Sequence, residues 1–264
     1  MDYPGRVIKA GESDGSLVRA IRKELNRALG FAPRSAARLD VRDPEFGSAV
    51  TQAVKLFQAR HVDAEGRPLK QDGQIGAITW EALFGSDFVP SVAEARTPFL
   101  ARVVKVAGDE AAKHVREVPV NSNRGPEVEA YLARAGARPG VSWCCAFVYW
   151  CHDEAARALG RSNPMVQTAG CLDHWQRASA AGAARVVRAR AVADPSLLGP
   201  GVIFIIDHGG GLGHTGIIAQ VNGGLLATIE GNTDASMTRE GGGVYRLTRK
   251  IADINLGFID YART

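Results

Sequence analysis

Three of the four cysteines in this chain of 264 residues lie close together, in the segment VSWCCAFVYWC at residues 141–151. A cysteine thiol becomes a nucleophile when it ionises, and the free N–H groups and dipole at the start of a helix favour the thiolate. We expect a helix between Ser142, a favourable N-cap residue, and Gly160, which can end a helix. Cys144 then falls in the first turn, and we predict that it is the reactive thiol.

The other three cysteines are predicted to be unreactive. Cys151 lies two turns beyond Cys144 on the same helical stripe, so we expect it in the core. Cys145 points about 100° away from that stripe and has no evident partner. Cys171 is expected to be buried and inert. Because Cys144 and Cys145 are adjacent, we also predict that oxidation can join them in a strained ring that silences the thiol.

A thiol nucleophile needs a base, normally a histidine, within hydrogen-bond reach. The chain has six histidines, at positions 61, 114, 152, 174, 208 and 214. His152 follows Cys144 on the same predicted helix, about 12 Å along its axis, which is too far. His208 lies in the glycine-rich stretch DHGGG, which we interpret as a loop. His214 opens a predicted strand, a rigid mount, and we predict that it is the base.

The next predicted strand supplies a group to orient this imidazole. Glu230 and Asn232, in TIEGNT, are two residues apart and therefore share a face. A two-residue loop at Asn222-Gly223 would put them on the face opposite His214. A three-residue loop would pair His214 with Asn232 and place all three on one face. The alternation of apolar and polar residues favours the second register, so we predict that loop or an equivalent bulge, with either Glu230 or Asn232 orienting His214.

The elements that must position these groups differ between two parts of the sequence. Residues 14–85 have apolar residues at helical spacing in three segments. Further helices are expected near residues 98–115 and 142–160. From Pro200 onward, apolar runs separated by Gly, Asn and Asp turns predict an antiparallel meander. We therefore predict an α+β fold, with a helical domain at residues 1–87, a linker at 88–97 and a second domain at 98–264.

The N-terminal segment resembles the type 1 peptidoglycan-binding domain, a three-helix module that binds bacterial cell walls. The residues that carry the resemblance are Leu25-Asn26, Phe46-Gly47, Ala53-Val54, Phe57-Gln58, Asp72-Gly73, Ile75-Gly76, Thr79-Trp80 and Leu83. The insert APRSAARLDVRDPE, at residues 32–45, departs from that family and leaves the shape of any binding groove open. The resemblance implies that peptidoglycan is a partner.

The segments SWCCAFVYWC, GVIFII, GHTGII and TIEGNT, in this order, resemble the CHAP family of cysteine- and histidine-dependent amidohydrolases or peptidases, which have a papain-like core. The resemblance extends over roughly residues 98–263. It implies that Cys144 is the nucleophile, that His214 is the base, and that Glu230 and Asn232 form the pair that follows. Cys145 departs from the family, which usually has a small residue there. No cluster of His, Cys and Asp has metal-ligand spacing, so we expect no metal or other cofactor.

Together the two resemblances imply a peptidoglycan hydrolase. The bond cut is either the amide between muramic acid and L-alanine or a peptide bond of the stem or crossbridge. Two alternatives stay open: a non-catalytic wall-binding protein, and a cysteine hydrolase of a non-wall amide. Fold alone does not decide between substrates.

Composition and charge restrict the partners. The net charge is +4, with basic residues spread along the chain, so we expect no nucleic acid. No apolar run is long enough to predict membrane insertion. The N-terminus lacks an apolar h-region, so we expect synthesis in the cytoplasm without a signal peptide. The protein would then reach the periplasm or wall through a holin, as an endolysin, or through a secretion machine, as an antibacterial effector with an immunity protein. We expect a monomer.

Overall fold

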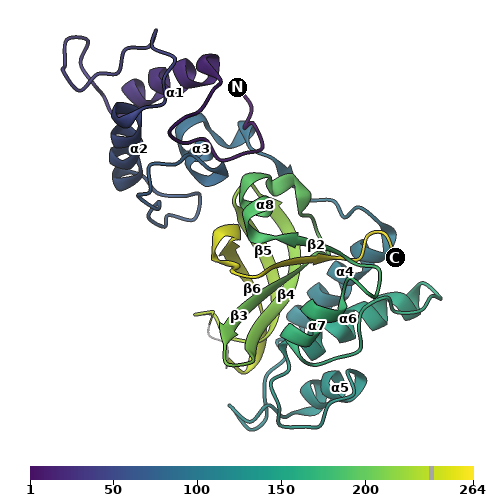
Figure 1. Cartoon of the computed structure of the whole chain (residues 1–264). Coiled ribbons are helices and arrows are strands. Elements are labelled where there is room, and N and C mark those ends of the chain that lie inside the picture. The colour runs from purple at the N-terminus through teal and green to yellow at the C-terminus, as the bar shows by residue number, and fades with distance from the viewer. Residues whose placement is uncertain (238–240) are drawn as a thin grey trace. The chain divides into compact units, whose positions relative to one another are not determined.

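The computed structural model of the chain describes residues 1–237 and 241–264 (Figure 1). The described residues form two compact units. One comprises Met1–Pro90 together with Val192–Pro195, and the other comprises Ser91–Ala191 together with Ser196–Thr264. No helix in the described part of the chain is both long enough and apolar enough to cross a bilayer.

The first unit is helical. It contains α1 (Gly15–Ala28), α2 (Ser48–Arg60), α3 (Ala77–Phe84) and the short 3-10 helix η1 (Ser86–Phe88). Asp14 caps α1, because its side chain accepts hydrogen bonds from the backbone N–H groups of Ser16 and Leu17. The three expected helices are therefore present. Their apolar faces meet in a core that includes Ile21, Leu25, Phe46, Val50, Val54, Phe57 and Trp80.

The insert at residues 32–45 is held to α1 by buried polar groups. Asn26 donates from Nδ2 to the carbonyl of Leu39 at 2.9 Å and accepts from the Leu39 N–H at 2.9 Å. Arg22 donates to the carbonyls of Asp40 and Glu45 and to the carboxylate of Asp43. These contacts give the insert a defined conformation without a helix or strand of its own.

The second unit packs helices on an antiparallel sheet, as the α+β prediction required (Figure 1). Its helices are α4 (Pro98–Ala112), α5 (Pro126–Arg134), α6 (Cys144–Ala158) and α7 (Cys171–Arg177). The chain also contains the short helices α8 (Arg188–Ala193), η2 (Pro195–Leu197) and η3 (Ile251–Asp253). The core between α4, α6 and the sheet includes Phe99, Leu100, Val103, Phe147, Ile203, Ile217, Ile229 and Ile259.

The sheet has the strand order β2-β7-β3-β4-β5-β6. Its strands are β2 (Ala184–Val187), β3 (Ile203–Gly209), β4 (Leu212–Asn222), β5 (Leu225–Thr233), β6 (Gly243–Lys250) and β7 (Gly257–Asp260). The predicted meander is correct for β3 to β6 and wrong for β7, which returns to pair with β3 and β2. This pairing covers the edge of β3 that a meander would leave open. The segment expected as a linker contributes β1 (Ser91–Val92), which pairs with β4.

Two local predictions near the site were wrong. The residue that caps α6 is Trp143 and not Ser142, because the buried Trp143 ring donates from Nε1 to Glu117 Oε1 at 2.8 Å and fixes where the helix begins. His208 lies within β3 and not in a loop, because the turn is made by the glycines that follow, which have positive φ. Cys144 is still in the first turn of α6, as expected.

The register between β4 and β5 agrees with the predicted alternative of a bulge. The hairpin has a two-residue loop, since Asn222 pairs with Leu225, but the ladder shifts between Ile218 and Gln220. Beyond this bulge Ile217 pairs with Ile229. Without it, the hairpin register would pair Ile217 with Glu230 and turn Glu230 to the face opposite His214.

Two histidines, His152 and His174, are fully buried in the second unit. His152 donates from Nδ1 to the carbonyl of Val148 at 2.9 Å, and His174 Nε2 is 2.9 Å from the Tyr261 hydroxyl. Burial lowers the pKa of His152 to about 4 and that of His174 to about 3. Both rings are therefore neutral in the folded protein near neutral pH.

We predict that the second unit loses stability as the pH falls from about 6.5 toward about 4. In this range the unfolded chain binds protons at its histidines, whose ordinary pKa is about 6.5, while folded His152 and His174 stay neutral. Urea unfolding followed by tryptophan fluorescence measures the effect. His152→Gln should make the pH dependence shallower, and His208→Gln, at an exposed position, should not. An unchanged free energy of unfolding between pH 6.5 and 4.5 would contradict the prediction.

Candidate active site

The thiol of Cys144 lies at the first residue of α6, where the helix meets the sheet. Gly231 of β5 allows this close approach, because a Cβ atom there would lie 2.7 Å from the Trp143 ring and 2.8 Å from Phe147. Cys144 is 2% exposed. Its sulfur is 3.4 Å from Cys171 Sγ and 4.0 Å from the carbonyl oxygen of Gly213. The residue before His214 therefore contacts the nucleophile predicted from the sequence.

His214 comes from β4 and is held by the neighbouring strand. Its Nε2 lies 2.8 Å from Glu230 Oε2, and both side chains are buried. Nδ1 is also buried, and it has no hydrogen-bond partner among the residues that the structure describes. Since Glu230 occupies Nε2, Nδ1 is the ring nitrogen that remains for a proton exchanged with Cys144.

Glu230 accepts hydrogen bonds from three side chains. Besides His214, Arg249 of β6 donates from Nε to Oε1 and from Nη2 to Oε2, both at 2.6 Å. The Thr228 hydroxyl donates to Oε1 at 2.5 Å. This bidentate arginine clamp and the hydroxyl fix both oxygens of a carboxylate that is fully buried. Glu230 is thus the residue of the predicted pair that contacts His214.

Asn232 occupies a different position. It is fully buried and has a φ of 57°, in the left-handed region, within an irregular part of the β5–β6 ladder. Both polar atoms of its amide lack a hydrogen-bond partner in the described part of the chain. An amide that is buried and unpaired in this way costs free energy, and such groups are typical of functional sites.

The sequence interpretation assigned no role in the site to Arg249, Thr228 or Cys171, which contact Glu230 or Cys144. Thr228 and Arg249 share the Glu230 face of their strands, since Leu226 pairs with Arg249 and Glu230 pairs with Tyr245. A buried carboxylate needs a cation, so the polar alternation of β6 could have indicated Arg249. Cys171 had no such signal, because α7 follows a long irregular segment.

The charges of the site are coupled. Burial opposes a charged His214, but electrostatic interactions with Cys144 and Glu230 prevail and raise the pKa of His214 to about 9. Burial likewise opposes a charged Glu230, and the bonds from His214 and Arg249 lower its pKa to about 2. Contact with the Cys171 thiol and burial raise the pKa of Cys144, while His214 lowers it. A thiolate at Cys144 therefore depends on the protonated imidazole.

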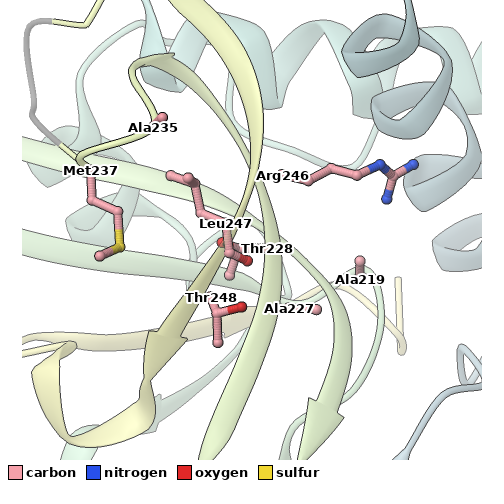
Figure 2. Close-up of a pocket in the computed structure, with 8 residues that line it drawn as sticks. All are labelled: Ala219, Ala227, Thr228, Ala235, Met237, Arg246, Leu247 and Thr248. Atoms are coloured by element: carbon pink, nitrogen blue, oxygen red, sulfur yellow. The ribbon is translucent and has the colours of Figure 1, made fainter. Parts of the chain in front are cut away.

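A separate pocket of about 430 Å³ lies over β5 and β6 (Figure 2). Its lining residues are Ala219, Ala227, Thr228, Ala235, Met237, Arg246, Leu247 and Thr248. Of the site residues described above it shares Thr228 alone. In the described residues, no group of three or more His, Cys, Asp or Glu side chains is arranged to hold a metal ion.

Comparison with known proteins finds one family model that matches part of the chain. Residues 136–232 match the model of the CHAP domain family, and the matched segment contains Cys144, His214, Glu230 and Asn232. No curated protein and no solved structure matches the chain. The match supports the CHAP family for the second unit, and with it a cysteine- and histidine-dependent amidohydrolase or peptidase.

We predict that Arg249→Gln lowers kcat/KM by about 10- to 100-fold, because a hydrogen bond to a charged group is worth about 1.5–3 kcal/mol. Arg249 lowers the pKa of Glu230, so its loss should also move the acid limb of the pH–rate profile to higher pH. Arg249→Lys should restore part of both. The control is Arg246→Gln, an exposed arginine of the same strand. Equal behaviour of the two glutamine variants would contradict the role of Arg249.

Proposed function

We propose that this protein hydrolyses an amide or peptide bond of bacterial peptidoglycan, with Cys144 as the nucleophile. The observation that carries the proposal is an arrangement whose reacting groups lie inside the CHAP match. A thiol starts α6, Nδ1 of His214 has no hydrogen-bond partner among the described residues, and Glu230, itself held by Arg249, bonds to Nε2. This is the arrangement that acyl transfer to a thiolate needs.

The reaction would use each residue in turn. Cys144 transfers its proton to Nδ1 of His214 and attacks the substrate carbonyl as a thiolate. The developing oxyanion can accept from the backbone N–H of Cys144, which has no partner within the helix at this position, and from the buried amide of Asn232. His214 then protonates the leaving amine, and water, deprotonated by His214, releases the acyl group from sulfur.

The buried thiol requires that substrate open the site. Cys171 and the Gly213 carbonyl both contact Cys144 Sγ, and only 2% of Cys144 is exposed. Three successive glycines with positive φ, Gly209, Gly210 and Gly211, form the β3–β4 turn that leads to Gly213. Because glycine allows many backbone conformations, this turn is the element that we propose shifts to admit the substrate.

The first unit would bind the wall and raise the local concentration of the hydrolase there. In support, a pocket of about 480 Å³ lies between the insert and the helices α1 and α2. Its lining includes both apolar and charged residues, among them Phe31, Ala36, Leu39, Ala53, Leu56, Arg22, Arg38 and Asp43. Such a surface suits the mixed polar and apolar character of a sugar–peptide polymer.

The hydrolase would act either as an endolysin or as an exported antibacterial effector. A neighbouring gene for a holin supports the first, and one for an immunity protein supports the second. Two other functions compete with this proposal: a non-catalytic wall-binding protein and a hydrolase of a non-wall amide. Digestion of sacculi and binding to sacculi distinguish them, because the first would bind without digestion and the second would not digest.

We predict that the purified protein releases peptide-containing fragments from isolated sacculi, and that mass spectrometry of these fragments identifies the bond cut. Cys144→Ser should reduce release by about a thousandfold or more, since it removes the nucleophile. Cys145→Ser, which alters the adjacent buried thiol, should retain most activity. If Cys145→Ser is the inactive variant, the nucleophile has been assigned wrongly; if no protein releases fragments, peptidoglycan hydrolysis is contradicted.

We predict that Ala49→Glu, in the pocket of the first unit, weakens binding to sacculi by about tenfold. Cosedimentation of the full chain carrying Cys144→Ser measures binding without digestion. Ala59→Glu is the matched control, because Ala59 is an exposed residue of the same helix outside the pocket. Equal binding by both variants would remove the pocket as the wall site.

A further inference from the structure

Cys171 has no part in the proposed hydrolysis, although its sulfur lies 3.4 Å from Cys144 Sγ. The two residues begin α7 and α6, and they are 6% and 2% exposed. All four cysteines are free in this structure. The sequence predicted Cys171 to be buried and inert. Its burial is confirmed. Because its sulfur contacts that of Cys144, however, Cys171 is placed to form a disulfide with it.

The other cysteines are less well placed for that reaction. Cys151 lies seven residues along α6 from Cys144, about 10 Å along the axis, and is fully buried in the core. Cys145 also interacts with Cys171, but its sulfur lies 3.5 Å from the carbonyl of Thr168, and a Cys145–Cys171 bond would leave the Cys144 sulfur free. A bond between Cys144 and Cys145 would close a strained ring of adjacent residues, whereas Cys171 meets Cys144 across two helices.

We propose that Cys171 is a resolving cysteine, which captures the oxidised form of Cys144 as a Cys144–Cys171 disulfide and so switches the site off reversibly. The inference rests on the proposed role of Cys144 as the nucleophile. It replaces the adjacent pair of Cys144 and Cys145 as the site of oxidation, and it gives Cys171 a chemical reason for its place beside the catalytic thiol.

The oxidant is a hydroperoxide, and the steps balance. The Cys144 thiolate attacks one peroxide oxygen, the S–O bond forms, the O–O bond breaks, and hydroxide leaves, so that Cys144 becomes a sulfenic acid. Cys171 sulfur then attacks the sulfenic sulfur. The S–S bond forms, the S–O bond breaks, and the Cys171 proton leaves with the oxygen as water. Two thiols are oxidised by two electrons and one peroxide is reduced.

The geometry favours this second step. A disulfide has an S–S length of about 2.05 Å, so the sulfurs must approach by about 1.4 Å from their present separation, a movement that side-chain rotation at two helix starts can share. Gly213 makes room for Cys171, because a Cβ at Gly213 would lie 3.0 Å from Cys171 Cβ. The disulfide leaves Cys144 without the free sulfur that attack on a carbonyl needs.

The test treats the full-length protein with hydrogen peroxide, blocks free thiols with an alkylating agent, and maps the cysteines by mass spectrometry. The expected product is a Cys144–Cys171 cross-link in wild type and in Cys145→Ser. Sacculus digestion should be lost on oxidation and return to its starting level with a thiol reductant. In Cys171→Ser, recovery relative to that variant's own starting activity should be at least about tenfold lower, because Cys144 proceeds to the sulfinic acid.

Several results would overturn the inference. They are a wild-type cross-link that joins Cys145 to either neighbour, sulfinic acid at Cys144 with no cross-link, or full recovery in Cys171→Ser. The mapping in wild type needs no variant, so a misfolded Cys171→Ser protein does not prevent a decision. A Cys144–Cys171 cross-link in a protein that never digests sacculi would contradict the proposed hydrolysis and leave the disulfide standing, so the two failures are distinguishable.

Discussion

The site depends on one buried carboxylate, that of Glu230, held between an imidazole and a guanidinium. A buried charge without partners is strongly destabilising, and Glu230 avoids this with bonds from His214, Arg249 and Thr228. These groups come from β4, β5 and β6, so the register of three strands is tied to the orientation of one ring. The same carboxylate keeps His214 charged, and the charge on His214 is what favours a thiolate at Cys144. The strand register orients this cluster. The cluster in turn determines the protonation of His214 and the reactivity of Cys144.

Close packing and one buried hydrogen bond bring Cys144, the predicted nucleophile, to this cluster. Gly231 lets the first turn of α6 lie directly on β5, and the bond from Trp143 to Glu117 fixes where the helix begins. The result is a buried site, in which interactions between charges are stronger than in water because the local dielectric is lower. The close packing that creates this environment also covers the thiol with Cys171 and Gly213. Movement of Cys171 and Gly213 therefore controls whether substrate reaches the thiol, and it also controls how easily the thiol is oxidised.

Much of the site could be predicted from the sequence, because it depends on local spacing. Cys144 at a helix start, His214 on a strand, and Glu230 two residues before Asn232 follow from periodicity and from the order of the motifs. The register needed a bulge, and sequence alone left a loop and a bulge as equivalents. Arg249, Cys171 and the return of β7 to β3 were missed, since they depend on which segments meet in three dimensions. Local propensity also misplaced the start of α6, where the packing of Trp143 overrode the capping preference of Ser142.

The protonation of His214 measures the central interaction most directly. In protein labelled with ¹⁵N at histidine, NMR as a function of pH reports the pKa of His214 and the protonation of each ring nitrogen. The account predicts a pKa near 9 and a proton retained on Nε2, facing Glu230. In a Glu230→Gln protein the pKa should fall markedly, because the carboxylate that stabilises the charged ring is gone. A wild-type His214 that titrates at or below about 6.5, the ordinary histidine value, would contradict the account.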